Sequence, residues 1–438
     1  MSARGLAALG LALLAACESP PRGLGASAEV ITLPNIVLIL ADDAGLECFG
    51  SYGGESYSTP RIDRMAAEGL QFDHCFAQPL CTPSRVKLLT GRGNLRNYTR
   101  FSILDPAERT VAELLQERGY ATGAFGKWQL LGAEHYGEHA GTGTHPRDAG
   151  FDRWCLWQVE RLGSRYHDPQ VDRDGVLETV EGAYGPDVFV DALLEFAAEP
   201  RGRPFFAWYP MALPHDPFDP VPGAPEGQDR AQRFAGMIGR VDHQVGRILD
   251  GLAQLGLAED TLVLFTSDNG THQSITSRAW GREVQGGKTR STDAGTRVPL
   301  VAWGAGVAGP GRRCNDLVDL SDFLPTLCEV TFTSVPTDRP LDGVSFAPQL
   351  RGERGAPREV LTQYSNPRPP GSKRNPRARW ARTKRHKLYD DGRLFDCVED
   401  PDEEQPLAAE QEPSGLRELL QGALDGMPEE PLHLRTRK

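Results

Sequence analysis

Two pairs of oxygen-donor side chains have the types and spacing to bind a cation. Asp42 and Asp43 directly follow an apolar run, and Asp268 and Asn269 follow a second one, Thr261–Thr266. Adjacent carboxylates are costly to hold together unless a positive charge neutralises them, which a hard cation does through oxygen ligands. Either pair alone fits a turn or a helix cap equally well. Because neither pair contains a histidine or a thiolate, together they predict one shared Ca²⁺ site, with Mg²⁺ as the alternative.

Cys81 is the third feature that could take part in a reaction, because it opens a predicted helix. Pro83 suits the first turn of a helix, where no intrahelical N–H is needed. The free N–H groups and the positive end of the helix form a seat for an anion. Arg85 adds a planar fork of hydrogen-bond donors. From these residues alone, Cys81 is equally a buried thiol or half of a disulfide.

The elements that must position these residues alternate between strands and helices. Asn35–Ala41 is a nearly continuous apolar run, as expected for a buried central strand. Further strands are expected at Phe205–Tyr209, Thr261–Thr266 and Leu300–Trp303. This alternation predicts an α/β fold, with a mostly parallel sheet between helices and ligand sites at the strand ends.

Three helices carry signals at their ends or along one face. Thr59 and Pro60 start one helix, which Gly69 ends. Thr110 and Glu113 form a capping-box pattern at the start of another. Apolar residues recur at helical spacing over residues 234–252, which predicts a long amphipathic helix. After about Val335 the composition changes, and the tail predicts a small antiparallel sheet with a closing helix.

Several short motifs occur in a consistent order along nearly the whole chain. They are Pro34–Val37 leading to Asp42-Asp43, Thr59–Asp63, Cys81-Thr82-Pro83-Ser84-Arg85 with Leu89-Thr90-Gly91, Gly126-Lys127-Trp128, Pro214–Phe218, Ser267–Gly270, Gly286-Gly287-Lys288, Arg297-Val298-Pro299, and Lys387–Tyr389 with Phe395-Asp396. In this order they resemble the type I, formylglycine-dependent sulfatases of the alkaline phosphatase superfamily. The resemblance implies an alkaline-phosphatase-like fold and hydrolysis of sulfate esters, with sulfated carbohydrates as the expected substrates.

The resemblance also implies a role for each matching residue. Cys81 would be oxidised to formylglycine by a maturation enzyme, and the hydrated aldehyde would be the nucleophile. The metal would be held by Asp42, Asp43, Asp268, Asn269 and the oxygen of modified Cys81. Lys127 and Lys288 would contact the sulfate, His215 with Lys288 would assist the leaving oxygen, and Arg85 would hold the formylglycine in place. Such cationic groups stabilise the charge that develops on sulfate oxygens.

Gln129 departs from the family pattern, which has histidine after Gly-Lys-Trp. In the family that histidine handles protons of the formylglycine hydroxyls, whereas an amide does not titrate near neutral pH. If the segment is extended, Lys127 and Gln129 point the same way, towards the sulfate. Asp268 and His272 are the candidates for the missing proton transfer, and His272 is equally a substrate contact or an exposed side chain.

The N-terminal residues have the features of an export signal. A short apolar run follows Arg4 and ends at Cys17, resembling a bacterial lipobox with a lipid-modified cysteine; a plain secretory signal is the alternative. Residues 1–17 are therefore the predicted signal, 18–33 a tether, 34–335 the catalytic domain and 336–438 a C-terminal subdomain. The implied location is periplasmic or cell-surface, held to the membrane by the lipid alone. A net charge of -12 argues against nucleic-acid binding.

Two rival functions remain open at the level of sequence. A relative in the same superfamily would hydrolyse phosphodiesters or phosphonates, although its two-metal members usually have Asp-His where this chain has Asp268-Asn269. The second rival is a catalytically silent homologue that binds sulfated glycans, which only Gln129 favours. The six remaining cysteines show no readable pairing, so disulfides and buried thiols are equal alternatives.

Overall fold

The computed structural model describes residues 33–366, 368 and 377–431. The predicted signal at 1–17, with Cys17, lies outside the described residues, as does the predicted tether except for Leu33. Within the described part of the chain, no helix is both long and apolar enough to cross a membrane.

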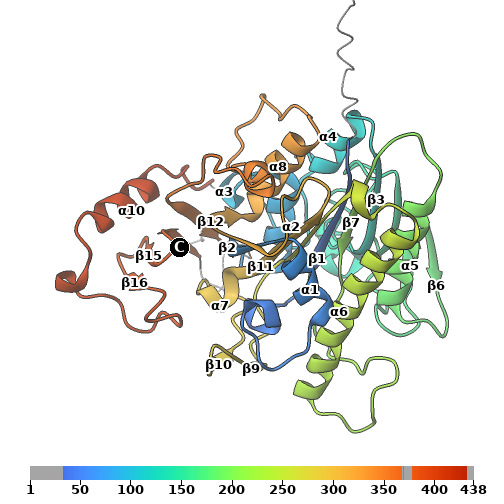
Figure 1. Ribbon diagram of the computed structural model, residues 1–438, viewed down its shortest axis with the longest axis horizontal. Helices are drawn as coiled ribbons and strands as arrows, with labels where there is room; N and C mark the ends of the chain where they lie inside the picture. The colour runs from blue at the N-terminus through green and yellow to red at the C-terminus, as the bar shows by residue number, and fades with distance from the viewer. Residues whose placement is uncertain (1–32, 367, 369–376, 432–438) are drawn as a thin grey trace, which may run out of the picture. The chain divides into compact units, whose positions relative to one another are not determined.

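A ten-stranded mixed sheet forms the centre of the molecule (Figure 1), in the order β12-β2-β11-β8-β1-β7-β3-β4-β5-β6. The five strands β8, β1, β7, β3 and β4 run parallel to one another. By contrast, β11 pairs antiparallel with β8, β5 with β4, and β6 with β5. The strands are β1 (Asn35–Ala41), β2 (Leu70–Phe76), β3 (Ala121–Lys127), β4 (Arg153–Trp157), β5 (Gln170–Arg173), β6 (Val176–Thr179), β7 (Phe205–Pro210), β8 (Thr261–Ser267), β11 (Arg297–Gly304) and β12 (Arg312–Asp319). The mostly parallel α/β prediction is confirmed.

Alternation along β1 divides the core into two layers. Ile36, Leu38 and Leu40 pack into one apolar cluster, and Val37 and Ile39 into the other. Both faces of the strand are covered by helices, so residues 36–41 are all apolar and fully buried, while the polar Asn35 at its start is partly buried. The helices are α1 (Pro60–Glu68), α2 (Cys81–Thr90), α3 (Asn94–Asn97), α4 (Val111–Glu117), α5 (Gly185–Ala198), α6 (Arg230–Gln254), α7 (Asp293–Thr296), α8 (Phe323–Val330), α9 (Ala347–Leu350) and α10 (Leu416–Asp425).

The local start signals of the helices are largely confirmed. Thr110 and Glu113 form the predicted capping box of α4, and α6 has an additional one from Asp229 and Gln232. Thr59 is the N-cap residue of α1, but its hydroxyl accepts from the Gly50 backbone instead of capping the helix. The cap position was therefore correct, while tertiary contacts decided the hydrogen bond.

The tail forms the predicted antiparallel sheet, with α10 packed against it. Its strands are β13 (Leu361–Ser365), β14 (Ala378–Arg382), β15 (His386–Tyr389) and β16 (Leu394–Asp396). A separate hairpin joins β9 (Thr276–Ala279) to β10 (Arg282–Gln285).

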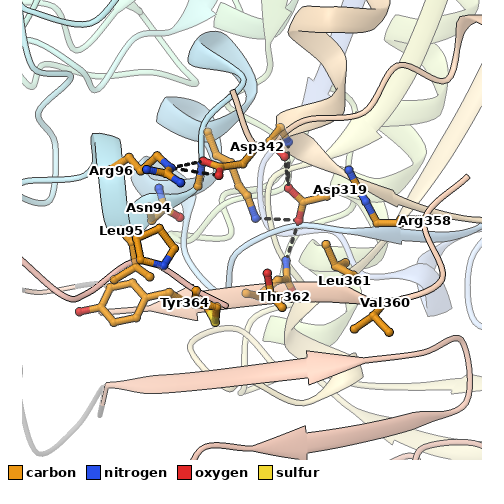
Figure 2. A pocket seen from close by; sticks show the side chains of 16 residues that line it. Asn94, Leu95, Arg96, Asp319, Asp342, Arg358, Val360, Leu361, Thr362 and Tyr364 are labelled. Atoms are coloured by element: carbon orange, nitrogen blue, oxygen red, sulfur yellow. Dashed lines mark hydrogen bonds and ion pairs between the residues drawn. The ribbon is translucent and has the colours of Figure 1, made fainter. Parts of the chain in front are cut away.

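A pocket of about 190 Å³ lies where β13 meets α2 and α3, and Figure 2 shows the polar side chains that line it. Asp319 is central to this junction, because it accepts from Lys87 at 2.6 Å and from Gln363 at 3.0 Å. Since α2 carries Lys87 and β13 carries Gln363, the two hydrogen bonds tie the C-terminal sheet to the helix that begins at Cys81. None of the predicted site residues lines this pocket.

Candidate active site

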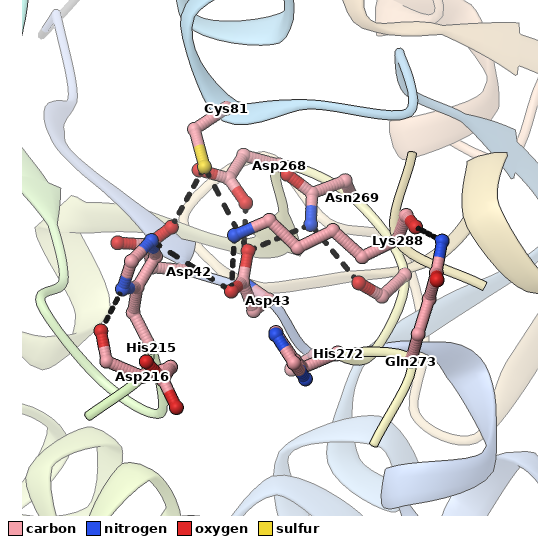
Figure 3. A network of polar contacts seen from close by, with 12 residues as sticks. Asp42, Asp43, Cys81, His215, Asp216, Asp268, Asn269, His272, Gln273 and Lys288 are labelled. Atoms are coloured by element: carbon pink, nitrogen blue, oxygen red, sulfur yellow. Dashed lines mark hydrogen bonds and ion pairs between the residues drawn. The ribbon is translucent and has the colours of Figure 1, made fainter. Parts of the chain in front are cut away.

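The two oxygen-donor pairs meet at the ends of neighbouring strands. Ala41 of β1 lies opposite Ser267 of β8 in the parallel ladder, so Asp42-Asp43 and Asp268-Asn269 leave the sheet side by side. Asp268 Oδ1 accepts from the Asp43 backbone N–H at 3.2 Å, and Asn269 Nδ2 donates to Asp43 Oδ1 at 2.8 Å. All four side chains are fully buried, and Figure 3 shows them grouped below Cys81.

Cys81 is the first residue of α2, as predicted, and its thiol faces the paired aspartates. Its Sγ lies 3.2 Å from Asp42 Oδ1 and 3.7 Å from Asp43 Oδ1. Burial, together with the charges of Asp268 and Asp42, raises the pKa of the Cys81 thiol well above its ordinary value. Since the thiolate is the nucleophilic form, the unmodified side chain is poorly suited to attack an ester.

Two lysines each contact one of the paired carboxylates. Lys127, the last residue of β3, lies 2.6 Å from Asp42 Oδ2, and Lys288, after β10, lies 2.5 Å from Asp43 Oδ2. Burial alone would raise the pKa values of both aspartates, but nearby positive charge outweighs it. Lys127 makes the largest contribution at Asp42, whose pKa is well below its ordinary value, and Lys288 at Asp43, whose pKa is lowered less.

Arg85 is fully buried and holds two residues of the site in place. Its Nε and one terminal nitrogen donate to Asp268 Oδ2 at 3.2 and 3.0 Å, and the other donates to the Lys127 carbonyl at 2.8 Å. With Cys81 unmodified, Arg85 makes no hydrogen bond to that side chain among the described residues and fixes the residues around it; its role in holding the formylglycine stays a prediction. Burial and the charge of Asp42 raise the pKa of Asp268 to about 7, despite Arg85.

The two histidines of the site differ in their contacts. His215 Nδ1 lies 2.5 Å from the Asp216 carbonyl, which requires a proton on Nδ1 and leaves Nε2 facing Asp43 Oδ2 at 3.8 Å. Burial, then Lys288 and Lys127, lower the pKa of His215 to about 3, so the ring is neutral near pH 7. His272 is half-buried, stacks edge-on against Phe218 and hydrogen-bonds to Ser274.

Gln129 is buried beside the site but adopts a backbone conformation that was not expected. Its φ is +56°, so the extended-segment argument for its direction does not hold. The backbone N–H donates to the Gln158 carbonyl at 3.2 Å, which continues the β3–β4 pairing past the strand end. The side-chain oxygen lies 3.5 Å from Thr82 Oγ1, the hydroxyl of the residue that follows Cys81.

The donor set fits a hard cation. One ligand atom each from Asp42, Asp43, Cys81 and His215 lies within 4.8 Å of the others. Asp268 stands outside that group because Arg85 holds its carboxylate. Asn269 Oδ1 is buried without a hydrogen-bond partner among the described residues, which is costly unless a ligand such as a cation takes it. His215 belongs to this group of possible ligand atoms, although the sequence suggested for it only a role at the leaving oxygen.

The described cysteines favour buried thiols over disulfides. All seven, including Cys81, are free and buried. Desolvation raises the pKa of Cys48, Cys75 and Cys155 in the same way as that of Cys81, so none is an activated thiol.

Gln273 is a site residue that sequence reasoning missed. Its Nε2 donates to the Lys288 carbonyl at 2.7 Å and to Thr289 Oγ1 at 2.6 Å, and the first contact is drawn in Figure 3. It therefore helps to fix the backbone of Lys288. A polar residue next to His272 carries no local signal for that role, because the contact joins two separate loops.

Comparison with known proteins agrees with this geometry. The sulfatase family model matches residues 34–333. Human arylsulfatase A is 34% identical over 381 residues, covering 78% of this chain and 72% of the relative. N-acetylgalactosamine-6-sulfatase from dog is 31% identical over 380 residues, covering 77% and 70%.

Two solved structures share the fold at lower identity. A protein crystallised with its substrate D-glucosamine-2-N,6-O-disulfate superposes with a TM-score of 0.74 at 21% identity, covering 90% of this chain and 97% of that one. A phosphonate monoester hydrolase of Agrobacterium radiobacter has a TM-score of 0.65 at 22% identity, covering 90% and 94%. These two likenesses concern the fold alone. The family match and the relatives above 30% identity carry the assignment: this chain belongs to the sulfatase family, the enzymes that hydrolyse sulfate esters.

Proposed function

We propose that this sulfatase removes sulfate from carbohydrates, using a formylglycine made from Cys81 and one divalent cation, Ca²⁺ in preference to Mg²⁺. One observation carries the proposal. Cys81 Sγ lies 3.2 Å from one oxygen of Asp42, while Lys127 holds the other oxygen at 2.6 Å. A nucleophile at position 81 would thus stand beside a carboxylate that can bind the metal, and the same carboxylate holds a lysine that can bind sulfate. Names such as N-acetylgalactosamine-6-sulfatase among the relatives support a sulfated sugar as substrate.

The cation would be held by Asp42, Asp43, Asp268, Asn269 and the group at position 81. Once a maturation enzyme has oxidised Cys81 and water has hydrated the aldehyde, the formylglycine would supply a hydroxyl as the nucleophile, and the cation would supply positive charge next to it. The paired carboxylates and the unpartnered Asn269 Oδ1 support Ca²⁺ or Mg²⁺ over a softer metal.

The charges of the pocket suit an anionic ester. Three buried carboxylates, Asp42, Asp43 and Asp268, are packed against three cations, Arg85, Lys127 and Lys288. These charges balance, so a divalent cation leaves the pocket net positive and attractive to a sulfate monoester. Such preorganised charge is most effective where water is excluded, and all the carboxylates here are fully buried.

The remaining side chains have distinct parts in the proposal. Lys127 and Lys288 bind the sulfate oxygens, and Lys288 with His215 assists the departing oxygen. Burial lowers the pKa of Lys288, but the negative groups around it, Asp43 first, together outweigh burial and raise the pKa above its ordinary value, so this amine stays charged. Gln129 orients a hydroxyl through its position beside Thr82, and His272 is a candidate substrate contact.

We further propose that the protein is exported and lipid-anchored at Cys17, on the periplasmic side or at the cell surface. The support is Leu14-Ala15-Ala16-Cys17 at the end of a short apolar run. We retain residue 335 as the boundary between catalytic domain and C-terminal subdomain.

Parallel assays test the proposed reaction. Protein produced together with a formylglycine-generating enzyme is assayed with an aryl sulfate and an aryl phosphodiester, then with a panel of defined sulfated mono- and oligosaccharides. We expect the sulfate ester to be hydrolysed faster, and at least one sulfated sugar to release inorganic sulfate. Faster turnover of the phosphodiester would replace the proposal by its superfamily rival, and no turnover of any ester by fully modified protein would favour a silent binding protein.

A further inference from the structure

The C-terminal sheet contacts the segment that follows Lys288. Arg382 of β14 and Lys387 of β15 lie directly opposite each other in the antiparallel ladder. Both side chains are almost fully buried. Two like charges at one rung repel, so each needs an acidic partner.

The partners of these two cations lead back to the active site. Arg382 pairs with Asp293, the first residue of α7, and its guanidinium lies 3.8 Å from the Phe76 ring centroid. Lys387 pairs with Glu403 at 2.9 Å and also donates to the Ser291 carbonyl. The two cations of one rung thus bind Ser291 and Asp293, which lie three and five positions beyond Lys288.

A tyrosine of the same sheet contacts the same segment. Tyr389 OH donates to Glu403 at 2.5 Å and lies 3.0 Å from Ser291 Oγ. Ser291 is therefore bonded through both its carbonyl and its hydroxyl to β15. One carboxyl or thiol atom each from Asp293, Cys397 and Glu403 also lies within 4.8 Å of the others. Because Arg382 and Lys387 already neutralise both acids, this group calls for no metal.

The segment is fixed just as firmly on its other side. The backbone N–H of Lys288 donates to the Thr271 carbonyl at 2.9 Å, and that of Thr289 donates to the Pro79 carbonyl, two residues before Cys81, at 2.8 Å. A Cβ on Gly287 would lie 2.2 Å from the Ala294 carbonyl carbon, so Gly287 packs directly against the residue that follows Asp293. A displacement of Asp293 would therefore be passed to Gly287 and to the neighbouring Lys288.

We infer that Lys387 and Arg382 are positioning residues that hold Lys288 against Asp43, which makes the C-terminal sheet part of the active-site framework. The inference rests on the proposed role of Lys288 at the sulfate. Catalytic groups lose much of their effect when displaced by about 1 Å, and Lys288 Nζ makes a close contact, 2.5 Å from Asp43 Oδ2.

A paired substitution tests the inference without leaving a buried charge alone. Lys387→Met combined with Glu403→Gln removes both charges of the pair. We expect kcat/KM for an aryl sulfate to fall by about tenfold or more, with cooperative thermal unfolding retained. The matched control is Arg385→Gln with Asp396→Asn, an ion pair of the same sheet that does not touch the Lys288 segment. The control should keep wild-type kinetics.

A double-mutant cycle separates positioning from a general structural effect. In a Lys288→Ala background, the Lys387→Met, Glu403→Gln pair should have little further effect, since the group it positions is gone. An equal loss in both backgrounds overturns the inference. If the paired variant does not fold, Tyr389→Phe serves instead, with an expected loss of roughly threefold for one hydrogen bond and the same requirement in the cycle.

The outcomes distinguish this inference from the proposed function. Wild-type activity of Lys288→Ala alone would overturn the role proposed for Lys288, and this inference with it. Low activity of Lys288→Ala together with wild-type activity of the paired and Tyr389→Phe variants would overturn only the positioning role.

Discussion

Asn269 and Asp43 are joined by a 2.8 Å hydrogen bond from Asn269 Nδ2 to Asp43 Oδ1, while Oδ1 of Asn269 is buried and has no hydrogen-bond partner in the described part of the chain. The bond fixes which end of the amide faces the carboxylate group and turns the acceptor oxygen to the side left free. A buried acceptor of this kind is destabilising unless something positive takes it. The amide is thus arranged to serve a cation in the folded protein.

Asn269→Ala is expected to weaken Ca²⁺ binding by about tenfold or more, since one oxygen ligand is removed and Asp43 loses its hydrogen bond. The measurement is calorimetric titration of chelator-treated protein with CaCl₂. Asn94→Ala is the control, because Asn94 is also a buried amide with an unpartnered oxygen but lies in the pocket of Figure 2. An unchanged affinity in Asn269→Ala would remove this residue from the metal site.

Ca²⁺ affinity is expected to rise with pH around neutrality. Burial and the charge of Asp42 raise the pKa of Asp268 to about 7, above its ordinary value of 3.8. The metal-free folded protein therefore holds a proton that cation binding must displace. Affinity should increase by about tenfold between about pH 6 and about pH 8. The dependence should vanish in Asp268→Asn; a persisting slope in that variant would assign the proton to another group.

Cys81→Ala is expected to abolish sulfate-ester turnover with little change in the unfolding temperature, because the side chain is small and only its chemistry is lost. Mass spectrometry of wild-type protein from a host with the maturation enzyme should find an aldehyde in place of the Cys81 thiol. Cys155→Ala, which removes another buried thiol, should remain active. Wild-type rates in Cys81→Ala would exclude formylglycine chemistry.

Gln129→Ala is expected to lower kcat by about tenfold, comparable to the loss of one oriented hydrogen bond of about 1.5 kcal/mol. The kcat–pH profile should keep its shape, because an amide contributes no titrating group. Steady-state rates across the pH range measure both effects. A shifted apparent pKa with an unchanged maximum would mean that Gln129 acts through a neighbouring acid or base.

Cys17→Ser is expected to release the protein from the membrane fraction without changing its catalytic constants, since the anchor and the site are separate. Fractionation of cells that produce each form, followed by immunoblotting and an activity assay, makes the comparison. Membrane association of the serine variant equal to that of wild type would show that Cys17 is not the lipid site.

The sequence by itself determined the elements whose signals are local. The nearly continuous apolar run Asn35–Ala41 became β1 with those bounds, because the part of a strand that is buried on both faces needs apolar side chains on both. The Thr110–Glu113 capping box formed because both partners lie within one helical turn. The motif residues Cys81, Lys127 and Lys288 were also identified from sequence, and chain topology brought them together at the strand ends.

Only the tertiary structure decided the contacts between distant segments. The left-handed conformation of Gln129 accompanies its backbone hydrogen bond to Gln158. The hydrogen bond that Lys387 donates to the Ser291 carbonyl comes from a sheet almost 100 residues later in the chain. Likewise, Arg85 turned to Asp268 and not to Cys81 because a buried guanidinium must be paired with a carboxylate, and 183 positions separate the two. Local patterns carry no information on such pairings, since burial and charge compensation arise only when the whole sheet is assembled.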